Sequence, residues 1–196
     1  ASRGFSVCLV DRKDRRFIGD KVCGDAIGRH HFDNLGLPYP EGKEKEGEIV
    51  GVKIYSPDRD SVFRISGYGL TGFMINRHLF GQRLLKYAVD AGAVLRDNVH
   101  VSVPIIKNGY VKGVTATDLK TGEKLKLLGT VTVDTSGVSA VVRRKLPPEI
   151  GIDAEVSWED KVICYREIRR LSKEIDEPEF CEIYLDLTAA PGGYCW

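Results

Sequence analysis

Short apolar or alternating runs, separated by turn sequences, dominate the chain and predict a protein rich in strands. The turns KNG at 107–109 and KTGE at 120–123 punctuate an antiparallel meander that ends in the run TVTVDTSG. The expected strands cover residues 5–10, 49–55, 61–66, 70–75, 93–96, 99–106, the meander after 107, 153–168 and 179–187.

Two segments show helical features instead. Residues 25–35 predict a short helix that ends at Gly36, because two prolines follow and keep the chain out of the helix. Asn76 is expected to cap a helix over roughly 77–91, with Gly92 just after its end. The apolar side of this second helix would carry Leu79, Leu84, Leu85 and Ala88. The charged segment 41–48 predicts a solvated loop.

Together these elements predict a mixed α/β fold. A strand–helix part contributes to a parallel sheet, whereas the hairpins build a second, antiparallel sheet. No Pro- or Gly-rich linker divides the chain, so we expect it to pass between the two parts more than once.

Composition narrows the class of protein. The 196 residues are 42% hydrophobic and 29% charged, as in an ordinary globular protein. The net charge of +1 gives no field that would attract nucleic acid. No run reaches the roughly 20 apolar residues of a membrane span, and no signal peptide is recognisable. We therefore expect a cytoplasmic protein, and a peripheral contact with a membrane stays open.

Both ends of the sequence suggest a fragment. The strand-like run FSVCLV at 5–10 has almost nothing before it, and the chain stops on the aromatic run PGGYCW. We therefore expect neighbouring sequence on either side.

The five cysteines do not form a metal-binding pattern. None of them belongs to a CxxC pair, which argues against structural zinc, and we expect no metal site. Cys8, Cys164 and Cys181 lie in apolar surroundings and are expected to be buried, reduced thiols. The adjacent His30 and His31 would point about 100° apart on a helix, so they cannot hold one metal together.

Three stretches carry residues suited to chemistry. Asp11 ends a strand, where dinucleotide-binding folds place a carboxylate on a ribose, although such an Asp is more often a turn residue. The run Cys23-Gly24-Asp25-Ala26 combines a thiol with small residues that permit close approach of a flat ring. The alternative is that Cys23 fills a small pocket in a turn. Asp134 ends the run TVTVD before a small-residue turn, which could also be any loop.

In this order, the stretches resemble the geranylgeranyl reductase family, flavoproteins of the same fold group as the aromatic hydroxylases. The resemblance rests on LVD at 9–11, CGDA at 23–26, Arg77 at the start of the second helix, and DTSGVSAVVR at 134–143. The closing PGGYCW matches the start of the family's P-x-x-Y-x-W-x-F-P motif through Pro191, Tyr194 and Trp196. These motifs span nearly the whole chain.

The resemblance implies an FAD-dependent enzyme of lipid biosynthesis that reduces C=C bonds of geranylgeranyl chains in archaeal-type membrane phospholipid precursors. Its electron donor would be NAD(P)H or reduced ferredoxin. By position, Asp11 would hold the adenosine ribose, Arg77 the phosphate–ribose region, and Val101 the adenine through its backbone. Cys23, Gly24 and Ala26 would line the flavin, Cys23 being the candidate catalytic residue. Tyr194 and Trp196 would line the lipid cavity.

The family also implies a division of the chain. Residues 1–48 and 76–146 would belong to a Rossmann-like FAD-binding domain, and residues 49–75 and 147–196 to an antiparallel substrate-binding domain. The family's GxGxxG strand, its later GD segment and the FP half of the closing motif are not in these 196 residues. The 196 residues alone are therefore expected to bind FAD poorly and to be inactive.

Two other functions remain open. A flavin monooxygenase would share Asp11 and the turn at 134–143 but would not need Cys23. A non-catalytic lipid-binding module would bind lipid without a flavin.

Overall fold

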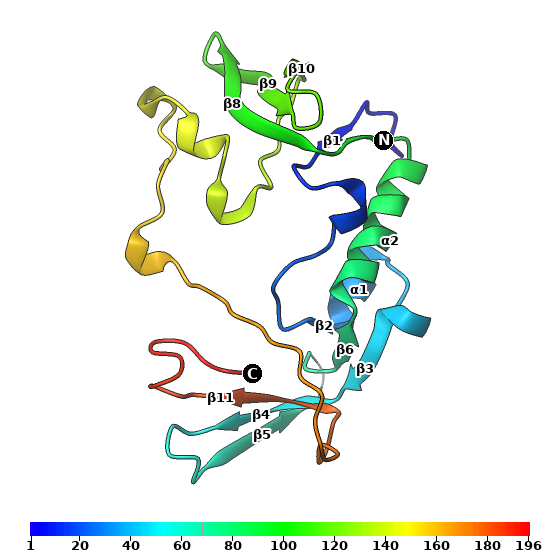
Figure 1. Ribbon diagram of the computed structural model, residues 1–196, viewed down its shortest axis with the longest axis vertical. Coiled ribbons are helices and arrows are strands. Elements are labelled where there is room, and N and C mark those ends of the chain that lie inside the picture. The colour runs from blue at the N-terminus through cyan, green and yellow to red at the C-terminus, as the bar shows by residue number, and fades with distance from the viewer. Residues whose placement is uncertain (68) are drawn as a thin grey trace. The chain divides into compact units, whose positions relative to one another are not determined.

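The computed structural model describes residues 1–67 and 69–196 and divides the chain into two compact units (Figure 1). The first unit comprises residues 1–18 and 82–163, and the second comprises residues 19–81 and 164–196. Both units mix strands with helical segments, as the sequence predicts.

The first unit contains a short parallel pair and an antiparallel meander. Strand β1 (Cys8–Val10) pairs in parallel with β7 (Val94–Arg96). Strands β8 (Val99–Lys107), β9 (Tyr110–Asp118) and β10 (Lys124–Leu128) form an antiparallel sheet in the order β10-β9-β8. The turns predicted at 107–109 and 120–123 join these strands, so the meander is confirmed up to β10.

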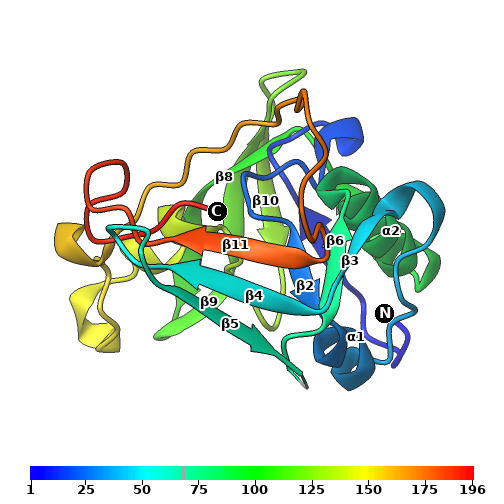
Figure 2. The ribbon, with the colours of Figure 1, turned by 90° about the horizontal axis from the view of Figure 1, so that it is seen from below.

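The second unit contains two three-stranded sheets. One has the order β2-β6-β3, and its strands β2 (Ala26–Gly28), β6 (Gly72–Ile75) and β3 (Lys45–Ile49) are antiparallel. The other has the order β11-β4-β5, and its three strands lie side by side in Figure 2. In it, β11 (Phe180–Tyr184) runs parallel to β4 (Gly51–Tyr55), which is antiparallel to β5 (Val62–Ser66).

An aromatic cluster forms the core of the second unit. Helix α1 (Arg29–Leu35) buries Phe32, whose ring meets those of Phe73 and Phe80 edge-on at centroid distances of 5.8 Å. Ile75 completes the cluster and is only 1% exposed. Strand β2 leads into α1 and pairs with β6. Because α1 and β6 both contribute to this closely packed core, β2 is held in place by it.

Helix α2 (Arg77–Asp90) begins and ends as its sequence predicts. Asn76 accepts a hydrogen bond from the backbone N–H of Leu79 at 3.1 Å, and Gly92 has a φ of 92° after the last turn. The predicted apolar side is partly wrong. Leu79 and Leu84 are exposed, whereas Phe80 and Leu85 are buried.

Two predicted strands are absent. Residues 129–136 and 153–168 form no strand in the described chain, and 158–160 form a short 3-10 helix. Val131 and Val133 are 78% and 75% exposed. Alternation alone does not make a strand, because the backbone groups also need a neighbouring strand to pair with.

Two boundaries near the N-terminal end also differ from expectation. The helix predicted over 25–35 starts only at Arg29, since residues 26–28 pair with β6 as β2. The loop predicted at 41–48 is a 3-10 turn followed by β3. Glu44 in the 3-10 turn is buried, whereas Glu48 on β3 is exposed and forms ion pairs with Lys45 and Arg29, each at 3.0 Å.

A buried lysine links the strands of the β11-β4-β5 sheet. Lys53 on β4 is 7% exposed, and its Nζ lies 2.7 Å from Glu177 and 3.5 Å from Glu182. The hydrogen bond to Glu177 raises the pKa of Lys53. Glu182 also accepts hydrogen bonds from Tyr55 and Tyr184, and the bond from Tyr184 is the main cause that raises that phenol's pKa to about 12. Charge pairing thus accompanies ring packing on this sheet, where the rings of Tyr55 and Tyr184 stack with their centroids 4.5 Å apart.

Candidate functional site

The segment that carries Cys23 is placed by a contact between two glycines. Gly19 has a φ of 107°, and its backbone crosses α2 at Gly81. A Cβ at position 81 would lie 2.3 Å from the Cα of Gly19, closer than two carbon atoms can approach. Glycine at position 81 therefore lets the loop of residues 19–25 lie directly on the helix.

The turn Cys23-Gly24-Asp25 is held from two sides. Asp25 has a φ of 60°, a left-handed conformation that is uncommon for a residue with a side chain. The carbonyl oxygen of Asp25 accepts the backbone N–H of Ile75 at 3.1 Å. On the other side, Nη1 of Arg166 donates to the carbonyl oxygen of Cys23 at 3.4 Å and forms an ion pair with Oδ2 of Asp25. The turn is thus fixed to β6 and to a residue far along the chain.

The carboxylate of Asp25 lies in a crowded electrostatic environment. Burial raises the pKa of this carboxyl, while the positive charges of Arg166 and Arg77 act in the opposite direction and Glu46 adds to the increase. Oδ1 of Asp25 is buried and has no hydrogen-bond partner among the described residues. Such an oxygen is an acceptor that a ligand hydroxyl or amide could satisfy.

The closing aromatic segment reaches the same turn. Tyr184 at the end of β11 exchanges two backbone hydrogen bonds with Cys195, at 2.8 and 2.9 Å. This pairing brings Trp196 against Gly24, where a Cβ would lie 3.0 Å from the indole Nε1. The rings of Tyr194 and Trp196 are 6.1 Å apart. Gly24 therefore leaves room for the indole, and Trp196 lies against the turn that bears Cys23.

Asp11 and Val101 lie together in the first unit. Asp11 follows β1, donates its N–H to Arg96 at 3.0 Å and accepts the N–H of Val99 at 2.9 Å. Its Oδ1 accepts the N–H of Lys13 at 2.8 Å, which orients the carboxylate. Val101 is two residues beyond Val99 on β8, just before a bulge. Asp11, predicted to contact the ribose, therefore pairs with β8 two residues before Val101, which is predicted to contact the adenine.

The remaining predicted residues belong to the second unit. Arg77 is the first residue of α2, and its Cζ lies 5.9 Å from the centroid of the Phe80 ring. Its positive charge acts to lower the pKa of Asp25. Ala26 begins β2 and is exposed. The second unit thus holds Cys23, Gly24, Ala26, Arg77, Tyr194 and Trp196, and their roles stay predictions.

Sequence reasoning missed Arg166. It lies 141 residues from Asp25 within a segment that the sequence predicts to be a strand, and other basic residues lie before and just after it. Nothing in the spacing distinguishes Arg166 from Arg169 or Arg170. Only the opposite charge of Asp25 in the CGDA run could have suggested a basic partner.

Asp134 organises the turn that follows the expected strand. Oδ1 accepts the N–H and hydroxyl of Ser136 at 3.0 and 2.6 Å, and Oδ2 accepts the N–H groups of Val142 and Arg143 at 2.9 and 3.0 Å. Burial acts to raise the pKa of Asp134, but these hydrogen bonds outweigh it and lower the pKa to about 2. The carboxylate is thus used to fold its own turn.

The lowered pKa of Asp134 leads us to expect that the stability of the fold depends on pH. The folded-state pKa lies below the ordinary value of 3.8, so the stabilisation is present above pH 3.8 and is lost as the pH falls towards 2. Because Asp134 is solvent-exposed, we expect Asp134→Asn to cost only about 1 kcal/mol at neutral pH. Urea unfolding at pH 7 and pH 3 would measure the difference, which should shrink at pH 3. An equal loss in Asp153→Asn, at another exposed position, would contradict the role of the turn.

The cysteines differ from expectation. All five are free thiols, but Cys8 and Cys164 are exposed and not buried as predicted. Cys181 is half-buried, and burial raises its pKa. Apolar neighbours in sequence do not by themselves bury a thiol: Cys8 lies on the exposed side of β1, and Cys164 lies in a segment without a strand. Within residues 1–67 and 69–196, no group of three or more His, Cys, Asp or Glu could hold a metal ion.

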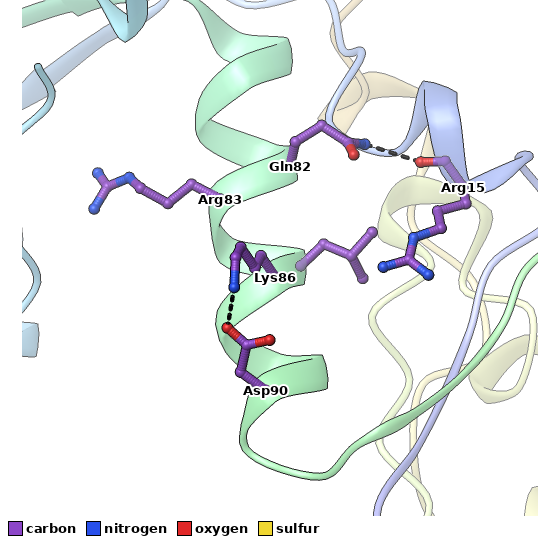
Figure 3. A pocket seen from close by; sticks show the side chains of 6 residues that line it. Arg15, Gln82, Arg83, Lys86 and Asp90 are labelled. Carbon is purple, nitrogen blue, oxygen red and sulfur yellow. Dashed lines mark hydrogen bonds and ion pairs between the residues drawn. The ribbon is translucent and has the colours of Figure 1, made fainter. Parts of the chain in front are cut away.

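A surface pocket of the first unit is lined by none of the candidate residues (Figure 3). Its polar groups are engaged with one another or with nearby backbone. Gln82 donates to the carbonyl oxygens of Arg15 and Ile18 at 2.9 and 2.6 Å, and Lys86 pairs with Asp90 at 2.5 Å. The pocket therefore contributes nothing to the candidate site. None of the described helices is long and apolar enough to cross a membrane.

Solved structures share the architecture of the chain. A geranylgeranyl bacteriochlorophyll reductase-like protein from Thermoplasma acidophilum matches with a TM-score of 0.78 at 18% identity, over 100% of this chain and 47% of that one. A myxobacterial chondrochloren halogenase, described as a variant of FAD-dependent halogenases, matches with a TM-score of 0.58 at 15% identity, over 74% of this chain and 34% of that one. The mixed α/β fold with antiparallel sheets, shared with these proteins, is thus confirmed.

Sequence comparison supplies the family. The chain is 41% identical over 194 residues to the digeranylgeranylglycerophospholipid reductase of Sulfolobus acidocaldarius, covering 99% of this chain and 42% of that protein. It is 30% identical over 199 residues to the enzyme of the same name from Methanothrix thermoacetophila, covering 100% of this chain and 48% of the relative. No protein-family model matches. The chain belongs to the geranylgeranyl reductase family, as its motifs predict, and spans less than half the length of these relatives.

Proposed function

We propose that the chain is part of an FAD-dependent reductase that saturates C=C bonds of geranylgeranyl chains in archaeal-type membrane lipid precursors. The observation that carries this proposal is the 41% identity, over almost the whole chain, to a protein named digeranylgeranylglycerophospholipid reductase. The turn that bears Cys23 beside Trp196 supplies a chemically suitable place for the reaction.

The donor and acceptor groups of the chain suit FAD. Asp11 follows a parallel strand pair, where a carboxylate can accept hydrogen bonds from ribose hydroxyls. Arg77 carries a positive charge suited to a phosphate. Oδ1 of Asp25 is a buried acceptor without a partner among the described residues, next to the turn predicted to line the flavin. Asp11, Val101 and Arg77, with the Cys23–Ala26 run, are therefore our candidates for holding the cofactor.

Reduction of an isolated C=C bond adds a hydride to one carbon and a proton to the other. FAD in its reduced form, when bound, supplies the hydride. Such a bond has no carbonyl group to stabilise negative charge, so the proton must arrive before or together with the hydride. Cys23 carries a proton on Sγ and either donates it or positions a water molecule that does so.

The aromatic segment suits the lipid. Tyr194 and Trp196 alternate with Cys195, so an extended backbone directs both rings to one side. Trp196 already packs beside the Cys23 turn. We propose that these rings contact the isoprenoid chain, that NAD(P)H or reduced ferredoxin supplies the electrons, and that the protein meets its substrate at a membrane surface.

The division into domains remains a prediction. We propose that residues 1–48 and 76–146 belong to the FAD-binding part, and residues 49–75 and 147–196 to the part that binds the substrate. The sheet β2-β6-β3 contains strands from both assignments.

A flavin titration tests the proposed cofactor site. Expressed within the full length found in the relatives, the protein should purify yellow. Asp11→Ala should weaken FAD binding by about 1–3 kcal/mol, because ribose hydroxyls would lose a charged acceptor. Asp60→Ala, in an exposed turn, serves as the control. The same affinity in both variants would remove Asp11 from the site.

The products separate the proposed function from its alternatives. A reductase converts geranylgeranyl lipid to a product with fewer C=C bonds and needs no oxygen. Oxygen consumption with a hydroxylated product would establish a monooxygenase instead. Lipid that is bound but recovered unaltered, in a protein without flavin, would establish a binding module.

A further inference from the structure

The segment of residues 161–176 is almost entirely exposed. It contains no helix or strand, and every one of its described side chains is exposed except that of Arg166. The side chain of Arg166 is 28% exposed and reaches the Cys23–Asp25 turn. Arg166 is therefore the residue through which this segment is attached to the second unit.

One nitrogen of Arg166 joins two parts of the turn. Nη1 donates to the carbonyl oxygen of Cys23 and to Oδ2 of Asp25. The first contact fixes the peptide group that follows the thiol-bearing residue, and the second fixes a side chain two residues later. A guanidinium group is planar and permanently charged, so it orients both acceptors at once.

The turn needs such an external contact. Asp25 adopts a φ of 60°, which costs a residue with a side chain about 1 kcal/mol or more. Gly24 adds flexibility, since glycine has the most conformational freedom to lose. Apart from Arg166, the turn is restrained among the described residues by the hydrogen bond from Ile75 to the carbonyl oxygen of Asp25 and by the contact of Trp196 with Gly24.

Charge also favours this arrangement. Asp25 is buried enough that its carboxyl loses solvation, and Glu46 acts on it with the same sign of charge. Arg166 and Arg77 compensate from two directions. Removing Arg166 would leave a buried carboxylate with only the more distant compensation from Arg77, which favours opening of the turn.

We propose that Arg166 is a positioning residue for catalysis: it holds the Cys23–Asp25 turn so that the thiol of Cys23 keeps a fixed position. The catalytic consequence rests on the proposed function. The structural part, that Arg166 keeps the turn closed, stands on the contacts alone.

Hydrogen exchange tests the structural part without flavin or lipid. The reporter is the amide of Ile75, which donates to the carbonyl of Asp25 at 3.1 Å. In Arg166→Met, this amide should exchange about tenfold faster, as expected for the loss of a charge-assisted hydrogen bond. Arg170→Met removes an exposed arginine four residues later and should leave the exchange unchanged. Unchanged exchange in Arg166→Met, or an equal increase in both variants, would overturn the inference.

Turnover tests the catalytic part in the full-length protein. Arg166→Met should lower kcat about tenfold or more, with KM for the lipid within about twofold and the FAD content preserved. Arg166→Lys keeps the charge and should recover part of kcat, whereas a purely structural loss would not follow the charge. It also serves if the Met variant does not fold. An effect on KM alone, or full kcat in Arg166→Met, would overturn the positioning role.

These outcomes are distinguishable from a failure of the proposed function. A wild type that reduces no lipid would contradict the proposed function, and the exchange measurement would then decide the inference by itself. An active wild type with an equally active Arg166→Met variant would leave the reductase intact and remove Arg166 from its mechanism.

Discussion

Gly81→Ala is expected to destabilise the protein by about 2 kcal/mol, although alanine is the better helix former. In the interior of an exposed helix, this substitution normally stabilises by roughly 1 kcal/mol. Here the new Cβ would lie 2.3 Å from the backbone of Gly19, so the loop or the helix must move. The steric cost exceeds the gain in propensity, and the sign of the change is reversed.

Urea unfolding would measure this effect. Gly47→Ala is the matched control, because a Cβ there would meet only the Cβ of Met74 at an ordinary 3.8 Å. We expect the control to change stability by less than about 0.5 kcal/mol. Since the loop of residues 19–25 carries Cys23, Gly81→Ala should also speed exchange of the Ile75 amide. A stabilised Gly81→Ala protein would show that the loop does not lie on α2 at this point.

Cys23→Ala is expected to lower kcat about 100-fold or more while FAD remains bound, since a positioned proton donor contributes about that much to a rate. Removing Sγ takes away the proton but no group that we assign to the adenosine or phosphate. Cys23→Ser keeps a small polar group and should retain measurable activity if the task is to position a water molecule. Single-turnover oxidation of the reduced flavin by lipid would measure the step directly.

Cys164→Ala is the control for this experiment, because Cys164 is an exposed thiol of the same unit. Its turnover should equal that of the wild type. Full activity in Cys23→Ala would show that Cys23 has only a packing role. This is the alternative stated from the sequence, in which Cys23 fills a small pocket in a turn.

The features predicted correctly from sequence are those determined over a few residues. Asn76 and Gly92 mark the ends of α2 because a cap acts on the adjacent backbone groups. The turns of the β8-β9-β10 meander depend on their own Asn and Gly residues in the same way. The motif CGDA at 23–26 stands out in the sequence by its small residues and its thiol, and the chain bends at Cys23 before β2 begins at Ala26.

The features that could not be predicted depend on partners far away in the chain. Strand β11 pairs with β4 across more than 120 residues, and no local pattern specifies this register. Val131 and Val133 alternate with polar residues, as in a strand, but no strand of the described chain pairs with them. Arg166 is one of several basic residues in its segment, and only the folded chain shows that it meets Asp25.

The contact between Trp196 and Gly24 gives the protein an optical property. The sequence contains two tryptophans, and the other one, Trp158, is 77% exposed in a different part of the fold. An indole in water emits at longer wavelength than one packed against protein, and a nearby thiol, peptide group or flavin quenches it. In a protein with Trp158→Phe, excited at wavelengths that the eight tyrosines do not absorb, the fluorescence of these 196 residues would come from Trp196 alone. Its intensity would then report the opening of the turn in real time with no label attached and, under the proposed function, the arrival of a cofactor or lipid.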